Sequence, residues 1–287
     1  MPHRLPSQED SNMPPQLSII GSGHVARTLG RLWHGGQCVL LRDVLSRSAE
    51  NAQAACDFIG AGRALHDYGA LTQADIYLIA TPDDQIAACC EQLAGSGRIV
   101  PGTVVFHCSG ALSASVLAAA SDRGAMVASM HPIRSFALPE QVAASFAGTW
   151  CGMEGDAPAL AVVTPLFAAI GARCIAVDPS AKTLYHAAAV FASNYLVTVL
   201  DVAVQAYGRA GIPEDVALQI MEPLVRKTVD QVFDAGTAAA LSGPIARGDM
   251  ATVERQAQAL SAWKEAHGSL YTCLAQATGQ LARRRKP

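Results

Sequence analysis

The sequence is poor in charge. Only 16% of its 287 residues are Asp, Glu, Lys or Arg, and the formal net charge is −3. With a pI near 6.2, the chain has no positive surplus to attract a phosphate backbone, so we expect no DNA or RNA partner. Hydrophobic residues make up 51% of the chain, which excludes general disorder and is enough for two folded domains.

Metal-ligand and redox motifs are also missing. The chain has eight cysteines and eight histidines, but no Cys-x-x-Cys pair and no His/Cys cluster at ligand spacing. We therefore expect no metal ion, and we interpret the cysteines as small core residues in a reducing cytoplasm. The absence of a Gly-x-Ser-x-Gly motif argues against an α/β hydrolase.

No segment has the form of a secretory signal. Residues 1–15 are polar and interrupted by proline, so we expect a disordered leader there. The most apolar long stretch, 187–204, contains Asn194 and Asp201, which favours a buried helix over a membrane span. We expect a cytoplasmic protein without a membrane partner.

A glycine turn near the N-terminus is the most informative segment. An apolar run leads into Gly21-x-Gly23-x-x-Ala26, and an amphipathic segment follows directly. Between a strand and a helix, Gly21 permits a tight turn, Gly23 lets a pyrophosphate approach the backbone, and Ala26 lets the helix pack closely. The N–H groups at the start of that helix would face the phosphates. The dinucleotide contacts predicted here are Gly21, Ser22, Gly23, His24 and Val25.

Strand and helix signals alternate as far as residue 178. Further strands are expected over 38–41, 75–80, 104–107, 125–130, 148–153 and 173–177. Small, polar or proline residues follow the earlier strands at their carboxyl ends, the edge where open α/β sheets bind ligands. Additional cofactor contacts predicted at this edge are Ser46, Arg47, Ser48, Ala80, Thr81, Pro82 and Ser109.

From Ser180 onward only helical periodicity is visible, with helices expected over 182–209, 213–233, 237–241, 250–267 and 269–283. The predicted fold class is α/β: a Rossmann-type parallel-sheet domain over 16–178, followed by an all-helical domain over 179–287. The helical part is too apolar for its size, so we expect a homodimer through it.

Motifs along nearly the whole chain resemble one family. They are Gly21–Ala26, Ser46-Arg47-Ser48, Thr81-Pro82-Asp83, His107–Gly110, His131-Pro132, Tyr185-His186 with Asn194, and Gly243–Asp249. The chain is similar to Rossmann-like NADP oxidoreductases that have an uncharacterised helical C-terminal domain. These are grouped with deazaflavin-dependent NADP reductases and are related to pyrroline-5-carboxylate reductase and 6-phosphogluconate dehydrogenase.

The resemblance implies an NADP-dependent reductase of a small oxo acid or imine. A few bacterial members look like an alternative ketopantoate reductase, so ketopantoate is the most specific substrate it suggests. A deazaflavin as second cofactor stays open, and so does a non-catalytic NADP-binding sensor. The family's related dehydrogenases associate through the helical half, as we expect for this chain.

Hydride transfer needs a group that protonates or polarises the acceptor. Lys182 and His186 are four residues apart and share one helical face, with Asn194 about 80° away. Related dehydrogenases place a lysine and an asparagine closer together, so His186 is the favoured proton donor, and Lys182, Asn194 and His131 would shape the substrate pocket. Structural alternatives are a His186–Asn194 core pair, an exposed Lys182, and a His131 that only ends its strand.

Two residues bear on cofactor choice. Asp43 lies 20 residues after Gly23, a spacing typical of the acid that binds the ribose of NAD. Arg47, flanked by Ser46 and Ser48, instead suits the 2′-phosphate of NADP. We favour NADP as cofactor. His107 is expected in the core, and Gly243–Asp249 is expected to form a turn with Arg247 paired to Asp249, a substrate contact across a dimer being the alternative.

Overall fold

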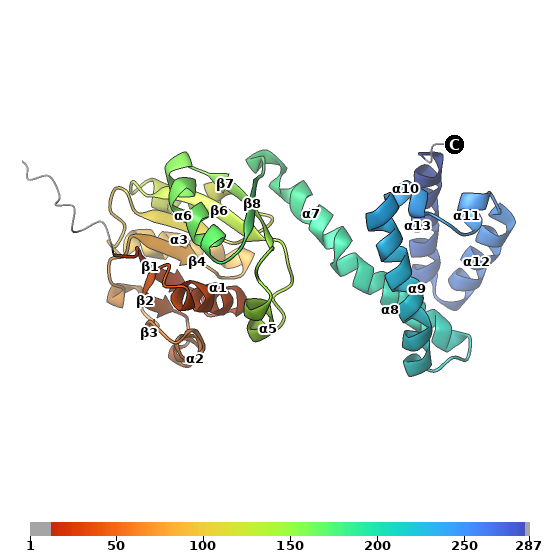
Figure 1. Cartoon of the computed structure of the whole chain (residues 1–287), viewed down its shortest axis with the longest axis horizontal. Coiled ribbons are helices and arrows are strands. Elements are labelled where there is room, and N and C mark those ends of the chain that lie inside the picture. Colours follow the sequence, from red (N-terminus) through yellow and green to blue (C-terminus); the bar gives the residue numbers. More distant parts are fainter. Residues whose placement is uncertain (1–12, 285–287) are drawn as a thin grey trace, which may run out of the picture. The chain divides into compact units, whose positions relative to one another are not determined.

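The computed structural model describes residues 13–284, so most of the predicted leader lies outside the described residues. The chain forms two compact units, one extending through Phe191 and the other starting at Ala192. The first contains an eight-stranded sheet, and the described part of the second contains only helices (Figure 1). The predicted fold class, a Rossmann-like sheet domain followed by a helical domain, is confirmed.

The strands are β1 (Gln16–Ile20), β2 (Leu40–Leu45), β3 (Arg63–Leu65), β4 (Ile76–Ile79), β5 (Val104–His107), β6 (Met126–Pro132), β7 (Trp150–Gly155) and β8 (Arg173–Ala176). They lie in the order β3-β2-β1-β4-β5-β6-β7-β8. From β1 the chain adds β2 and β3 on one side, and it then returns to add β4 and the later strands on the other side of β1. The carboxyl ends of β1 and β4 therefore flank a topological switch point, where open α/β sheets bind ligands.

Helices cover both faces of the sheet. They are α1 (His24–Gly35), α2 (Ala49–Ile59), α3 (Ile86–Gly95), α4 (Ala118–Ser121), α5 (Pro139–Ala144) and α6 (Ala157–Ala169). The helix α7 (Lys182–Ala192) follows β8 and contributes to neither core cluster. One core cluster packs α1, α2 and α6 on one face, and a second packs α3 and α4 on the other. Burial on both faces explains why strands such as β4 are continuous apolar runs.

An aromatic cluster fixes α1 and α6 against the sheet. The ring of Trp33 lies 5.3 Å from that of Phe167 and 6.3 Å from that of Phe106, both edge-on. Its indole nitrogen donates to the Leu166 carbonyl at 2.9 Å. Because the buried N–H has a partner, this large side chain enters the core without an unsatisfied polar group.

The sheet corrects three sequence predictions. β2 begins at Leu40 rather than Cys38 and runs on to Leu45, and the three-residue strand β3 was not predicted. β7 pairs antiparallel to β6, with Pro132 opposite Cys151. The connection between them holds only the short helix α5, so the chain starts β7 at the edge where β6 ends instead of crossing over.

The second unit contains α8 (Asn194–Arg209), α9 (Glu214–Ala235), α10 (Thr237–Ala240), α11 (Pro244–Arg247), α12 (Met250–Trp263) and α13 (Glu265–Arg283). The single helix predicted over 182–209 is two helices, because Ser193 leaves helical geometry at φ −125° and ψ −71°. Asn194 therefore begins α8 and does not share a helix with Lys182.

One apolar helical stretch in the described chain, Pro179–Arg209, is long and apolar enough to cross a membrane by length and composition alone. None of its most apolar window is buried within the chain. The sequence favoured a buried helix here, and within the single chain this window is not buried. Leu196, Val197 and Val199 are exposed in the single chain, whereas Val190, Leu200, Val202 and Val204 are half-buried.

Candidate functional site

The glycine turn joins β1 to α1 as predicted. Gly21 has φ +115°, and a Cβ there would collide with the Ala80 carbonyl oxygen, so only glycine fits between these two segments. The Cβ position of Gly23 meets no atom within 4 Å. The turn is thus closed on the protein side and open on the other side, as a backbone that receives a phosphate group requires.

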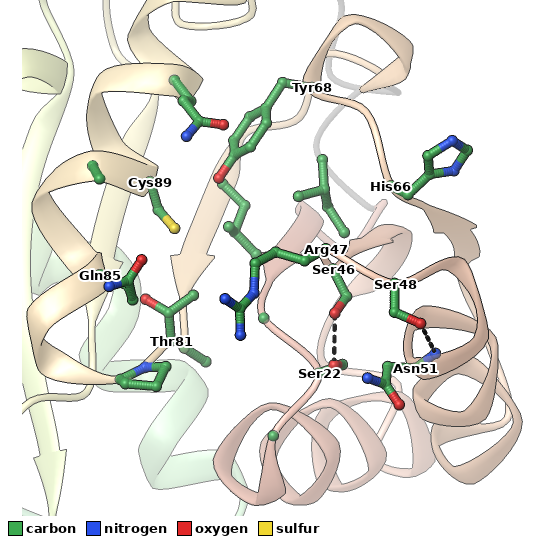
Figure 2. Close-up of a pocket in the computed structure, with 18 of the residues that line it drawn as sticks. Ser22, Ser46, Arg47, Ser48, Asn51, His66, Tyr68, Thr81, Gln85 and Cys89 are labelled. Carbon is green, nitrogen blue, oxygen red and sulfur yellow. Dashed lines mark hydrogen bonds between the residues drawn. The ribbon is translucent and has the colours of Figure 1, made fainter.

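A cavity of about 710 Å³ lies at the switch point beside this turn. Its lining includes the predicted cofactor residues Gly21, Ser22, Gly23, Ser46, Arg47, Ser48, Ala80, Thr81 and Pro82. The predicted contacts His24, Val25 and Ser109 are not among its lining residues. Tyr68, Gln85 and Cys89, which the sequence did not single out, complete the wall formed by α3 and the segment after β3 (Figure 2).

Asp43 and Arg47 differ in their availability to a ligand. The Asp43 carboxylate is buried; it accepts from Arg63 Nε at 3.0 Å and from the backbone N and Oγ1 of Thr72 at 2.8 and 2.6 Å. Arg47 is exposed, points into the cavity, and has no hydrogen bond or ion pair within the described chain (Figure 2). A ribose hydroxyl cannot reach Asp43 without breaking these bonds, whereas a phosphate can approach Arg47.

Serine and threonine hydroxyl groups line the same cavity. Ser22 and Ser46 hydrogen-bond each other at 2.9 Å across the turn, and Ser48 caps α2 by accepting from the Asn51 backbone (Figure 2). The hydroxyl of Thr81 is buried and has no partner among the described residues. Buried polar groups normally have a partner, so Thr81 fits a wall that a polar ligand completes. These residues fit a dinucleotide.

A second cluster lies at the carboxyl ends of β5 and β6, around Lys182 at the start of α7. Lys182 is 2% exposed, and its Nζ donates to the Ser109 carbonyl at 3.1 Å and to Ser129 Oγ at 2.7 Å. Glu154 Oε1 lies 3.9 Å from the same nitrogen. The interpretation of Lys182 as an exposed helix-start lysine is therefore wrong: the ammonium is a buried, bonded group.

Three ring side chains lie beside this lysine. His131 Nδ1 hydrogen-bonds the Tyr185 hydroxyl at 2.9 Å, and the rings of His131 and His186 lie 5.6 Å apart. A Cβ on Gly110 would lie 2.5 Å from His186 Nδ1 and 2.7 Å from the His131 ring. Both imidazoles therefore pack onto the bare backbone of Gly110, and Gly152 leaves the same kind of room for Tyr185.

Burial sets the charge of this cluster. It lowers the pKa of His131 to about 4, and the charges of Lys182 and His186 act in the same direction. Burial also lowers the pKa of His107 to about 4 and raises the pKa of Tyr185 to about 12. His131 and His107 are therefore neutral imidazoles near pH 7, and Tyr185 is a neutral phenol that can donate a hydrogen bond.

Residues 5–132 match the Rossmann-like domain family, and residues 149–278 match the family described as a domain of unknown function, DUF2520. The chain thus combines a Rossmann-like domain with a C-terminal DUF2520 domain. The DUF2520 match begins within the first compact unit and so includes β7, α6, β8 and α7.

Solved structures share this fold over almost the whole chain. A Thermotoga maritima protein is 24% identical, with 93% of this chain and 98% of that chain covered and a TM-score of 0.72. A Bacteroides fragilis protein described as an NADP oxidoreductase is 19% identical, with 93% and 99% covered and a TM-score of 0.75. A Plasmodium falciparum pyrroline carboxylate reductase, solved with NADP bound, is 10% identical, with 94% and 99% covered and a TM-score of 0.57. No curated protein matches the sequence.

Other candidate residues of this Rossmann-DUF2520 protein have structural partners. Ser109 Oγ donates to Asp83 Oδ2 at 2.8 Å and accepts from the backbone N of Leu112 at 3.0 Å, so its hydroxyl is used within the protein. His107 is a fully buried core histidine, as predicted. Asp249 caps α12 through Thr252 and has no ion pair with Arg247 in the described chain.

Three residues of the second cluster had no role in the sequence-based prediction: Ser129, Glu154 and Tyr185. Glu154 carried a signal that could have been used, because it directly follows the strand predicted over 148–153, and a carboxylate that continues a buried strand needs a partner. Within residues 13–284, no group of three or more His, Cys, Asp and Glu side chains is placed to hold a metal ion.

Proposed function

We propose that this protein is an NADP-dependent oxidoreductase that transfers a hydride between NADPH and a small oxo acid or imine. The observation that carries the proposal is the cavity at the switch point, in which Arg47 is free to bind a ligand while Asp43 is held inside the protein. The names of the Bacteroides fragilis and Plasmodium falciparum structures add support for an NADP-linked activity.

The cofactor would lie along the cavity. The backbone of Gly21–Gly23 and the N-terminus of α1 would hold the pyrophosphate, and Ser46 with Arg47 would hold the 2′-phosphate. Thr81 offers its unpartnered hydroxyl between these groups and the second cluster. The bound nicotinamide supplies the hydride chemistry, and the protein supplies position and proton transfer.

The second cluster would serve the substrate. His186 Nδ1 is buried and has no hydrogen-bond partner among the described residues, so it can bind a substrate oxygen or nitrogen and deliver the accompanying proton. His131 and Tyr185 would shape the pocket beside it, and Lys182 would act as a fixed charge behind Ser109. A substrate role for Asn194 stays a prediction.

The test is oxidation of NADPH by the purified protein against a panel of oxo acids and cyclic imines, with ketopantoate first. Turnover that is faster with NADPH than with NADH supports the proposal. Tight NADPH binding without oxidation by any compound would instead favour a non-catalytic sensor. Turnover only with a reduced deazaflavin would favour the deazaflavin-dependent alternative.

We also propose a cytoplasmic homodimer joined through the second unit. Large apolar side chains on α8 and α9 are exposed in the single chain, among them Leu196, Val197, Val199, Leu218, Ile220 and Leu224. Burial at about 25 cal/mol per Å² of apolar surface makes a second copy of the same surface a favourable partner. Light scattering on the detergent-free protein at micromolar concentration should give twice the chain mass, and a monomeric mass would refute this assembly.

A further inference from the structure

Behind the proposed substrate cluster lies a buried chain of three polar side chains, of which only Lys182 has a role in the proposed function. It joins Lys182 on α7, Ser129 on β6 and Glu154 on β7, and all three residues are at most 5% exposed. The chain exists because β7 runs antiparallel to β6 and places Glu154 directly opposite Ser129. Directly opposed residues of antiparallel strands point to the same face of the sheet.

The contacts of this chain lead from Lys182 through Ser129 toward Glu154. Lys182 Nζ donates to Ser129 Oγ at 2.7 Å, and the Ser129 side chain interacts with the Glu154 carboxylate. Glu154 Oε1 accepts from the backbone N of Ala114 at 2.8 Å and lies 3.9 Å from Lys182 Nζ. The serine hydroxyl therefore accepts from the ammonium, and its own proton is directed to the Ser109 carbonyl at 3.4 Å, with the Glu154 carboxylate close by.

Neither end of this chain is stable alone as a charged group. An unpaired ammonium in such a site would lose its proton, because a charge that is removed from water without a partner is strongly destabilised. The Glu154 carboxylate, 3.9 Å from the ammonium and held by the backbone N–H of Ala114, supplies that partner. Lys182 and Glu154 together carry no net charge, and the positive ammonium of Lys182 lies next to the Ser109 carbonyl.

We propose that Glu154 is a positioning residue that keeps Lys182 protonated, and that the positive charge held in this way adds to burial in disfavouring the protonated form of His131. The proposal rests on the proposed function only in treating this cluster as the substrate site, because the charges of Lys182 and Glu154 are present without cofactor or substrate. In this proposal the antiparallel strand β7 carries the carboxylate that sets the protonation of Lys182 beside the proposed substrate site.

The electrostatic surroundings agree with this assignment. Burial lowers the pKa of Lys182 and raises that of Glu154, while each partner's charge opposes the effect on the other. The charge of Lys182 lowers the pKa of His131. The other titratable groups that face Lys182 or His131 are Asp83, His107, Cys108, Tyr185 and His186.

The test is an NMR titration of the His131 imidazole in the full-length protein without NADPH or substrate. In Glu154→Gln, Lys182 loses its counter-charge and its proton, so the pKa of His131 should rise by about one unit. Glu154→Asp keeps a carboxylate and should stay near the wild-type value. Glu140→Gln removes an exposed carboxylate from α5 and serves as the matched control.

Two outcomes would overturn the proposal. An unchanged pKa of His131 in Glu154→Gln would show that the pair is already neutral, and a lowered pKa would show that Lys182 keeps its proton without Glu154. If Glu154→Gln does not fold, Lys182→Met tests the second step, because removing the ammonium should raise the pKa of His131 by a similar amount, and an unchanged value would contradict the proposal. Failure of NADPH oxidation alone would count against the proposed function and leave this titration unaffected.

Discussion

Replacing Arg47 with alanine should remove most of the preference for NADPH over NADH. The guanidinium lies in the cavity next to Ser46 and has no partner within the described chain. Its loss therefore breaks no internal contact, and the change in affinity reports on the ligand alone. NADH lacks the 2′-phosphate, so its affinity should change little.

The expected size follows from the exposure of the side chain. A hydrogen bond to a charged group contributes about 1.5–3 kcal/mol, and a tenfold change in affinity corresponds to about 1.4 kcal/mol. Solvent screens an exposed arginine, which places the effect at the lower end of that range. The dissociation constant for NADPH should therefore increase about 10- to 30-fold.

Titration calorimetry with both nucleotides measures this ratio directly. Arg31→Ala is a matched control, because Arg31 stacks over Phe58 outside the cavity lining and should leave both affinities unchanged. Raising the salt concentration should weaken NADPH binding more in the wild type than in Arg47→Ala. An NADPH to NADH affinity ratio that is the same in wild type and Arg47→Ala would refute the assignment of the 2′-phosphate to Arg47.

Two further substitutions test the second cluster. His186→Gln keeps a side chain that can hydrogen-bond but cannot transfer a proton in the same way, so kcat should fall at least about 10²-fold with NADPH affinity little changed. An equally large loss of NADPH affinity would mark His186 as a structural or cofactor residue. Near-full activity would move the proton-donor role to Lys182 or His131. Gly110→Ala places a methyl group against the rings of His131 and His186 and should cost about 1–3 kcal/mol in stability, measured by thermal unfolding, with turnover reduced. Gly95→Ala, whose Cβ position meets nothing within 4 Å, should show neither effect.

The parts of the site that could be predicted from the sequence are those that depend on local sequence patterns. The turn at Gly21 and Gly23 and the cap at Ser48 depend on residues within a few positions of each other, and the structure forms both. The carboxyl ends of strands meet at one edge in any parallel sheet, so Ser46, Arg47 and Thr81 could be expected to lie near the glycine turn.

Long-range partners decided what the sequence could not show. Asp43 has the spacing of a ribose-binding acid, yet Arg63 and Thr72, 20 and 29 residues away, hold its carboxylate inside the protein. Lys182 has the local context of an exposed residue, but its partners Ser129 and Ser109 are 53 and 73 residues away. Glu154 meets Ser129 only because β7 reverses direction, and no local pattern encodes that reversal.

The two clusters are far enough apart to act independently. Arg47 follows β2 and His131 lies on β6, and the strand order β2-β1-β4-β5-β6 separates them by four strand spacings. At about 4.8 Å per spacing the separation is about 19 Å, roughly twice the distance over which salt screens exposed charges at physiological ionic strength. The charge of Arg47 therefore contributes little to the protonation of His131, whose pKa is lowered first by burial and then by the charge of Lys182. Cofactor choice at one end of the sheet and proton transfer at the other are thus separate physical problems in this fold, and a substitution that changes one need not disturb the other.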